Sequence, residues 1–450
     1  MSGATYDEDS GMGWPVQGVA LLSSSRRILV LSLVVLVATG ITPEARARQR
    51  MVKRLSNGVI YRVYEQRHPN LRIRTVTVHE KRVSSIRAVL GSGKLPGWER
   101  TSSVARRTGA IVAINGDYGR PSGRPVMAFA HASRLIQTPL TAGQNFAVTP
   151  SSRARIGFPK PQLWMNAFGT NVPIGRLNDG GPYGHSLAMF DRAGGYLEKP
   201  PKRACSVRLM PDGFPRPGSE GKGIVAPYRV QRVKCSKGRL FPMGGRVISA
   251  RWRTGKSDLL ASIPVGATVW LGWTLGWGPV QETIGGNPAL VHEGQVVVPK
   301  SRAPFFARHP RTGVGVTRDG SVILATVDGR QRRSIGMTLR GFARFFRSLG
   351  AVTALNLDGG GSTTMVVRGR VMNRPSDGSE RPVSSALVVL PPGRILGANR
   401  TRASEFASVW GTVAQDPAST GGLAHSLMRE GVDLRGSMKK AAHRFRLVSR

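Results

Sequence analysis

The sequence predicts an α+β protein with a sheet-rich mixed core, flanking helices and one large domain. Apolar and polar residues alternate over residues 58–90 in runs rich in Val, Ile and Thr, which is typical of antiparallel strands. Two later segments, 101–118 and 338–362, each combine a helical pattern, a glycine, a short apolar run and a polar loop. The 450 residues are enough to bury a large core, and no coiled-coil or solenoid repeat competes with this interpretation.

The N-terminal segment has the pattern of an export signal. Ser25-Arg26-Arg27 precedes an uncharged run over residues 28–43 and a small-x-small site at residues 45–47. The paired arginines also resemble a twin-arginine signal. We therefore expect residues 1–47 to direct the protein to the cell envelope or the medium, with an uncleaved N-terminal anchor as the alternative. Contact with a membrane is expected through this region alone.

The charge of the chain is strongly positive. Lys and Arg number 66 against 25 Asp and Glu, which gives a formal net charge of +41 and a pI near 11.7. Such a charge favours anionic partners, and for an exported protein these are anionic polymers of the cell envelope. The arginines are spread along the whole chain, and no DNA-reading motif occurs, so no specific nucleic acid is expected as a partner.

The two helix-and-strand segments are expected to deliver polar loops to one cleft. In the first, Thr101 or Ser102 caps a helix, Gly109 ends it, and a buried strand over residues 110–114 leads into Asn115. In the second, Thr338 caps a helix with an apolar face, Gly350 ends it, and residues 351–357 form a strand that leads into Asp358. Ligand sites commonly lie where such strand ends meet.

The remaining chain is less regular. We expect one domain over residues 55–392, with a loop-like segment at 151–182, and a weakly ordered basic tail over 393–450. Cys205 and Cys235 are the two cysteines. A disulfide between them would close a loop of about 30 residues and stabilise the fold by ~3–4 kcal/mol; two buried thiols are the alternative.

The sequence Asp358-Gly359-Gly360-Gly361-Ser362 is the clearest candidate for a binding loop. Glycines let a backbone approach a ligand closely, and consecutive amides can form an anion-binding nest. No Lys follows in the position of a Walker motif, so nucleotide hydrolysis is disfavoured. A tight turn between two core strands is the alternative, although one glycine would serve a turn.

The chain resembles the phosphodiester glycosidases related to the lysosomal uncovering enzyme. The resemblance covers roughly residues 55–392 and is carried by the sequences AINGDYG, IGGNPALVHEG, RHPRTGVGVTRDG, TVDGRQ, NLDGGGSTT and PSDGSERPVS. Asp117 and Tyr118 stand where the family often has Gly/Phe-Phe. The resemblance implies one large catalytic domain that hydrolyses the anomeric C1–O bond of a sugar-1-phosphodiester.

This reaction asks little of a general acid, because its leaving group is a phosphate monoester with a last pKa of about 6. The demand falls on cationic and N–H donors that hold the departing charge. Asp358 is the predicted principal carboxylate, as nucleophile or as base for water; capping of the glycine loop is its alternative. Asp328 is the second-choice carboxylate, with a plain turn as its alternative, and His309 is a candidate proton donor.

The predicted substrate-binding residues flank these candidates. Arg311 is the predicted phosphate clamp, because a guanidinium grips phosphate through two hydrogen bonds, although a solvated surface arginine is its alternative. The full predicted set of substrate-binding residues is Asn115, Gly116, Arg311, Thr312, Gly359, Gly360, Gly361, Ser362 and Asp377.

The predicted function is an exported glycosidase that acts on a sugar-1-phosphodiester in an envelope polymer or glycoconjugate. The alternative is a non-catalytic module that binds wall polymer on the same fold. No cofactor is expected to be required. The metal question stays open: Asp-bearing loops have the oxygen ligands that Ca²⁺ prefers, but no EF-hand-like spacing occurs.

Overall fold

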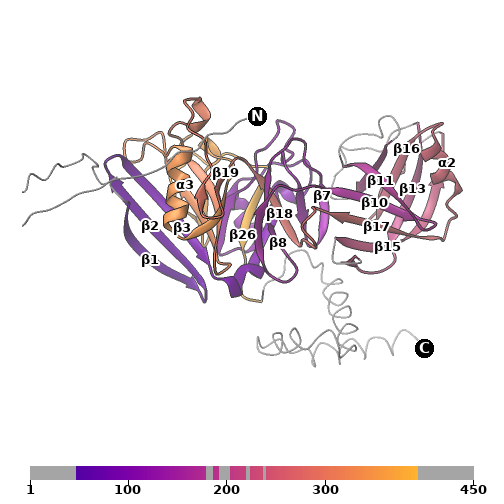
Figure 1. Cartoon of the computed structure of the whole chain (residues 1–450), viewed down its shortest axis with the longest axis horizontal. Helices are drawn as coiled ribbons and strands as arrows, with labels where there is room; N and C mark the ends of the chain where they lie inside the picture. Colours follow the sequence, from indigo (N-terminus) through magenta and orange to yellow (C-terminus); the bar gives the residue numbers. More distant parts are fainter. Residues whose placement is uncertain (1–46, 179–185, 192–202, 219–222, 237–239, 394–450) are drawn as a thin grey trace, which may run out of the picture. The chain divides into compact units, whose positions relative to one another are not determined.

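A computed structural model describes residues 47–178, 186–191, 203–218, 223–236 and 240–393 (Figure 1). The expected export signal and the expected basic tail lie outside these residues. Among the described residues, no helix has both the length and the apolar character that crossing a membrane requires.

Three open sheets form the frame that carries the candidate site. The first sheet contains, in spatial order, β1 (Arg48–Ser56), β2 (Val59–Arg67), β3 (Asn70–Val78), β22 (Val322–Val327), β21 (Arg311–Thr317), β23 (Ala351–Asn356), β19 (Ala289–His292) and β20 (Gln295–Val296). The second contains β25 (Arg370–Val371), β24 (Met365–Val367), β5 (Val112–Asn115), β26 (Ser385–Val389) and β4 (Ile86–Leu90). The third contains β7 (Arg134–Gln137), β6 (Phe129–His131), β18 (Glu282–Gly286), β8 (Gln144–Val148) and β9 (Ala154–Gly157).

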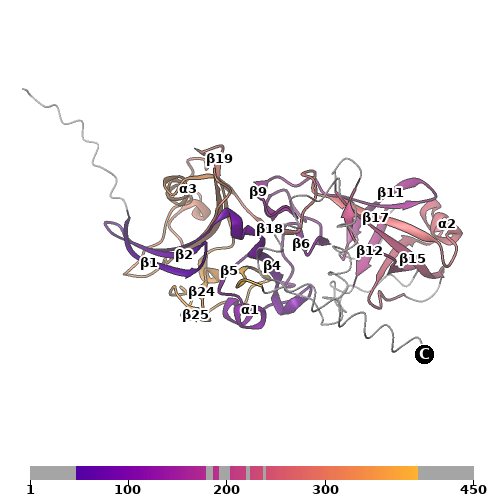
Figure 2. The same cartoon turned by 90° about the horizontal axis from the view of Figure 1, so that it is seen from below.

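The sheets and two helices pack in layers. Val76, Ile114 and Phe146 belong to one buried cluster, which joins the first, second and third sheets. The other face of the first sheet packs on helix α3 (Leu339–Ser348), and the other face of the second packs on helix α1 (Thr101–Thr108). Figure 2 shows α1 beside β4 and β24. Apolar burial on both faces therefore holds these two sheets in place.

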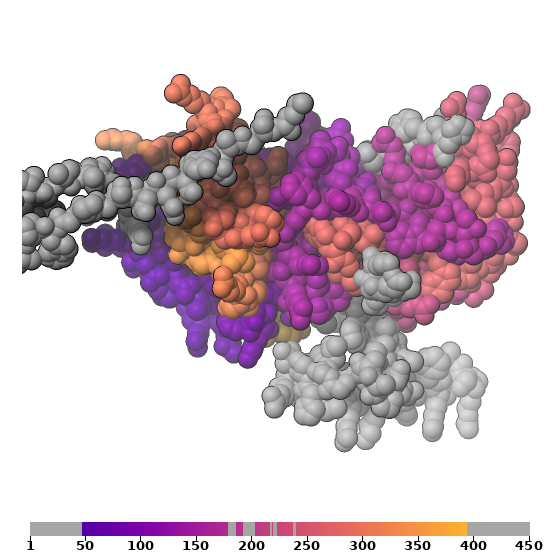
Figure 3. Space-filling model, viewed as in Figure 1, coloured from indigo at the N-terminus to yellow at the C-terminus, as the bar shows by residue number. Residues whose placement is uncertain are grey.

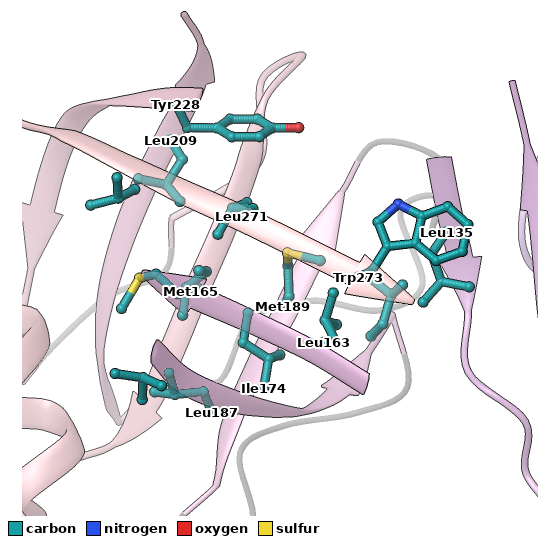
Figure 4. Packing of buried hydrophobic residues seen from close by; sticks show 14 of the residues in the cluster. Leu135, Leu163, Met165, Ile174, Leu187, Met189, Leu209, Tyr228, Leu271 and Trp273 are labelled. Carbon is teal, nitrogen blue, oxygen red and sulfur yellow. The ribbon is translucent and has the colours of Figure 1, made fainter. Parts of the chain in front are cut away.

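A separate closed sheet is inserted between β9 and β18. Its strands are β10 (Gln162–Ala167), β11 (Thr170–Leu177), β12 (Leu187–Asp191), β13 (Ala204–Pro211), β15 (Ile224–Lys234), β16 (Arg246–Arg251) and β17 (Thr268–Thr274). The short β14 (Arg216–Pro217) pairs with β15, and helix α2 (Gly255–Ser262) contacts β13 and β16. Strand β13 pairs with both β16 and β15, and this pairing closes the ring. Inward side chains such as Met165, Met189 and Leu271 fill its interior (Figure 4).

The prediction of a sheet-rich fold is confirmed, but helices contribute less than expected. The described residues contain three α-helices of eight to ten residues. Thr338 caps α3 as predicted, because its side chain accepts a hydrogen bond from the Gly341 amide. The predicted cap of α1 is wrong: Arg100 occupies the cap position without a side-chain hydrogen bond, whereas Gly109 ends the helix with a φ of 63°.

The prediction of a loop over residues 151–182 is wrong, because β9, β10 and β11 occupy most of it. These strands are short, and Pro173 and several glycines interrupt the alternation of apolar and polar residues, so the sequence pattern is weak.

Cys205 and Cys235 form a disulfide in the closed sheet. The bond continues the pairing of β13 with β15, since their neighbours Ser206 and Lys234 lie opposite each other.

Candidate active site

The two polar strand ends meet directly. Asn115 is the last residue of β5 in the second sheet, and Asp358 follows β23 of the first sheet by two residues. The Asn115 side chain donates from Nδ2 to the Asp358 carbonyl at 2.6 Å, and the Asp358 amide donates to the Gly116 carbonyl at 3.0 Å. Hydrogen bonds therefore fix the backbone of Asp358 from the neighbouring sheet.

Asn115 is the centre of a buried network behind Asp358. It has no exposed surface, and its Oδ1 accepts from the Thr312 hydroxyl at 2.8 Å and from the Thr364 amide at 3.0 Å. Thr312 is also fully buried. The structure therefore gives Asn115 and Thr312 a positioning role in place of the predicted contact with substrate.

Replacement of Asn115 by Ala is expected to lower the free energy of unfolding by about 3 kcal/mol, because it leaves buried donors and acceptors unpaired. Chemical denaturation measures this loss. Asn171→Ala is the control, since Asn171 is an exposed residue near the start of β11 and its side chain bonds to Asn166; the variant should stay within about 0.5 kcal/mol of the wild type. Equal effects of the two substitutions would show that the network does not stabilise the site.

The Asp358 carboxylate is half-buried and forms no ion pair in the part of the chain that the structure describes. Burial raises its pKa above the ordinary value near 4, whereas the Ser362 hydroxyl, the Gly359 amide and the charge of Arg381 lower it. Asp358 is therefore held in place by hydrogen bonds, with a positive charge nearby, as a base or nucleophile requires.

The glycines after Asp358 lie where neighbouring atoms or the backbone conformation leave no room for a side chain. A side chain at Gly359 would place its Cβ 2.8 Å from the Pro310 carbonyl oxygen, and Gly360 has a φ of +57°. A side chain at Gly361 would overlap the carboxylate of Asp377. Only glycine fits without displacing these neighbours.

The prediction of a row of free amides in this loop is wrong. The loop forms a short 3-10 turn, Gly360–Ser362, whose amides are largely used within the protein. The Gly360 amide donates to the Pro310 carbonyl, and the amides of Ser362 and Thr363 donate to carbonyls of the loop itself. Cationic side chains, rather than a backbone nest, must therefore supply most donors to an anion at this site.

Asp377 and Arg381 form an ion pair against this turn, four residues apart in the sequence. The carboxylate and the guanidinium are both within contact range of the position that a Gly361 side chain would occupy. The guanidinium is about half exposed, and its charge lowers the pKa of Asp358. Arg381 is therefore a cation at the candidate site, one that the sequence analysis did not single out.

Arg311 is not placed as the predicted phosphate clamp. Its side chain is buried, and its Nε donates to the Met337 carbonyl at 3.0 Å. Its Nη2 donates to the carbonyls of Phe305 and Ala307 at 2.8 and 2.6 Å. Burial lowers the pKa of Arg311 to about 10, so the guanidinium stays charged at neutral pH. Its main role is to fasten the segment that includes the 3-10 turn Pro304–Phe306.

His309 positions a second exposed cation, Arg330. Its Nε2 lies 2.8 Å from the Pro304 carbonyl, so this nitrogen carries the proton, and its Nδ1 accepts from Arg330 Nη2 at 3.3 Å. A side chain at Gly360 would lie 3.4 Å from the same Nη2 atom. Both ring nitrogens of His309 are thus occupied, and the predicted proton-donor role finds no support here. Arg330 is therefore an exposed arginine beside the glycine turn, whereas Arg311 is buried.

Asp328 is also reassigned. Its carboxylate is buried, pairs with Arg74 at 2.7 Å through Oδ2, and accepts from the Arg374 amide at 3.1 Å through Oδ1. Its carbonyl accepts from the Ser334 hydroxyl. With both oxygens engaged, Asp328 fastens β22 to its neighbours, and nothing in this arrangement supports the predicted catalytic role.

Tyr118 and Asp117 border the site and were not predicted as site residues. The Tyr118 hydroxyl donates to the Asn287 carbonyl and accepts from Asn356 Nδ2, both at 2.7 Å. Burial, and then the negative charge of Asp358, raises the pKa of Tyr118 above its usual value, so the phenol stays neutral. The sequence could have pointed to Asp117 and Tyr118, because both residues depart from the pattern of the family that the chain resembles.

The Asp117 carboxylate lies directly under this surface. It is buried, and its two oxygens accept from the amides of Tyr118 and Met127 at 2.7 and 2.6 Å. Burial, with a smaller contribution from the charge of Asp358, raises the pKa of Asp117 to about 7, although the two hydrogen bonds lower it. Within the described residues, no three His, Cys, Asp or Glu side chains gather as a metal site would need.

The fold is shared with solved structures of low sequence identity. A hypothetical protein from Synechocystis aligns at a TM-score of 0.56 and 22% identity, over 75% of this chain and 63% of that one. A candidate exported protein of Burkholderia pseudomallei K96243 aligns at a TM-score of 0.51 and 20% identity, over 71% of this chain and 74% of that one. These likenesses define the class of fold.

Sequence comparison gives a match to one family over part of the chain. Residues 219–390 match the model of the phosphodiester glycosidase family. The N-acetylglucosamine-1-phosphodiester alpha-N-acetylglucosaminidase of Mus musculus is 46% identical over 67 residues, which are 15% of this chain and 13% of that enzyme. The uncharacterized SPbeta prophage protein YomE of Bacillus subtilis is 42% identical over 90 residues, 20% of this chain and 14% of that protein. The chain thus spans about a seventh of the length of each of these relatives.

Proposed function

We propose that the protein is an exported glycosidase that hydrolyses the anomeric C1–O bond of a sugar-1-phosphodiester in an envelope polymer or glycoconjugate. The observation that carries the proposal is the geometry at Asp358. Its carboxylate lies beside the glycine turn and forms no ion pair with any residue that the structure describes, and the exposed cations Arg330 and Arg381 flank the same turn. The family match supports this class of reaction.

In the proposed chemistry one carboxylate promotes attack on the sugar, and two cations stabilise the leaving phosphate. The C1–O bond breaks, and its electron pair leaves with the phosphate oxygen, whose charge Arg330 and Arg381 neutralise. In one route Asp358 attacks the anomeric carbon and forms a glycosyl ester, which water then hydrolyses to release the sugar and restore the carboxylate; in the other route Asp358 takes a proton from the water that attacks this carbon. Tyr118 borders the site with a hydroxyl group able to bind a sugar hydroxyl, and the buried Asn356 holds this hydroxyl in place through its Nδ2.

The test is release of free sugar from a synthetic sugar-1-phosphodiester. The wild-type protein is expected to turn this substrate over and to release a phosphate monoester. If the wild type and Asp358→Asn bind the substrate equally well without releasing sugar, the protein is a binding module and the proposed activity is wrong.

The positive charge is proposed to retain the protein on anionic envelope polymers. Strand β1 exposes Arg48, Arg50, Lys53 and Arg54 at the surface, where Figure 3 shows it in indigo. Raising the salt concentration from about 0.1 to about 1 M shortens the Debye length from roughly 10 to 3 Å. We expect this change to release most of the protein from isolated cell walls, measured by sedimentation. Retention that salt does not alter would contradict electrostatic binding.

A further inference from the structure

A basic pocket lies beside the segment that Arg311 fastens. Its volume is about 400 Å³. It is lined by Pro299, Lys300, Ser301, Arg302, Phe306, Thr338 and Arg340. Three of these side chains are cationic and none is acidic. Within the described residues, Lys300, Arg302 and Arg340 form no ion pair, so nothing on the protein neutralises the pocket.

Arg340 lines this pocket, and one of its hydrogen-bond donors has no partner in the part of the chain that the structure describes. Its Nη1 donates to the Val298 carbonyl at 2.7 Å, which fixes the guanidinium on one side. Its Nε is buried and finds no hydrogen-bond partner among the described residues. A buried donor without a partner is costly, and a charged acceptor satisfies a guanidinium best. The three cationic side chains that line the pocket therefore suit a multiply charged oxyanion.

The pocket and the glycine turn are connected through one short segment, because the Gly360 amide donates to the Pro310 carbonyl and the next residue, Arg311, is anchored beside the pocket. Arg311 holds the carbonyls of Phe305 and Met337, and the residues that follow them, Phe306 and Thr338, line the pocket. Consecutive Cα atoms are about 3.8 Å apart, so the pocket begins one residue beyond each anchored carbonyl. We expect a substrate that extends from the glycine turn past this segment to reach Phe306 and the three cations.

We propose that this pocket binds a second phosphate group of the substrate, one that is not cleaved. This inference rests on the proposed function and narrows its substrate class to sugar-1-phosphodiesters with a further phosphate, as in a repeating sugar-phosphate polymer. Lys300 and Arg302 contribute exposed positive charge, Arg340 contributes a fixed guanidinium, and Phe306 offers an apolar surface to the carbons between the two phosphates.

The test compares two substrates that share the scissile bond, one with a neutral aglycone and one whose aglycone carries a terminal phosphate. The double variant Lys300→Ala/Arg302→Ala is expected to raise KM about tenfold for the second substrate, which corresponds to 1.4 kcal/mol. Its KM for the first substrate and its kcat for both should stay within twofold. The control is Arg318→Ala/Arg347→Ala, which removes the same charge from exposed positions outside the pocket.

Binding of inorganic pyrophosphate, measured by calorimetry, separates this proposal from the proposed function. We expect the pocket variant to bind pyrophosphate at least tenfold more weakly than the wild type, and Asp358→Asn to keep wild-type affinity. If neither substrate is hydrolysed but this pattern holds, the proposed activity fails and the pocket stands. If the pocket variant binds pyrophosphate as the wild type does, or raises KM equally for both substrates, the proposal is overturned.

Discussion

Replacement of Asp358 by Asn is expected to lower kcat for sugar release by about 10³-fold, the scale of a lost base or nucleophile. The fold should survive, because the backbone amide and carbonyl of Asp358, rather than its carboxylate, bond to Gly116 and Asn115. Asn also resembles the neutral form that burial already favours at this position. The measurement is initial-rate kinetics, with circular dichroism to compare the folds.

The matched control is Asp212→Asn. Asp212 lies on the closed sheet, where its carboxylate pairs with the exposed Arg229 at 2.9 Å. A surface pair of this kind contributes little, so kcat should stay within twofold of the wild type. If Asp358→Asn keeps more than a tenth of the wild-type kcat, Asp358 only caps the glycine turn and is not the catalytic carboxylate.

Asp117 is expected to make the folded protein less stable as the pH rises from about 4 to about 7. Its pKa is raised from an ordinary value near 4 to about 7, so the folded state favours the protonated form. Below pH 4 both states are protonated, and the contribution of Asp117 to stability is fully present. As the pH rises, the unfolded state ionises first, and by pH 7 roughly 4 kcal/mol is lost, at 1.36 kcal/mol for each unit of pKa.

Urea denaturation at several pH values measures this effect, with Asp117→Asn as the reference, because Asn does not ionise. The stability of the wild type should fall relative to this variant between pH 4 and 7. Asp319→Asn is the control: Asp319 is a turn residue whose pKa is lowered, chiefly by the Thr317 hydroxyl. If the free energy of unfolding depends on pH in the same way for the wild type and Asp117→Asn, folding does not raise the pKa of Asp117.

The backbone of the candidate site was predictable because its signals are local. The capping Thr338, the glycine after each helix and the apolar run before each polar loop all act within a few residues. These signals located both strand ends. The interpretation that Asn115 and Asp358 belong to one cleft agrees with the hydrogen bonds between the two loops.

The roles of the polar side chains were not predictable, because their partners come from distant segments. Arg311 bonds to Met337, and Thr312 bonds to Asn115, so neither is free to meet a ligand. In a chain with so many arginines, nothing local marked Arg330 as the cation beside the glycine turn. For Arg381, the spacing of four residues from Asp377 was a usable signal, since such pairs often interact.

The closed sheet is an insertion in the third sheet, since the chain enters it after β9 and returns to the third sheet at β18. The entropy lost when such an inserted loop closes grows only with the logarithm of its length, by about 0.6 kcal/mol for each doubling. Insertions within residues 158–281 are therefore inexpensive for the pairing of β8 with β18. This part of the molecule is free to change in size while Asp358 and its hydrogen bonds remain undisturbed.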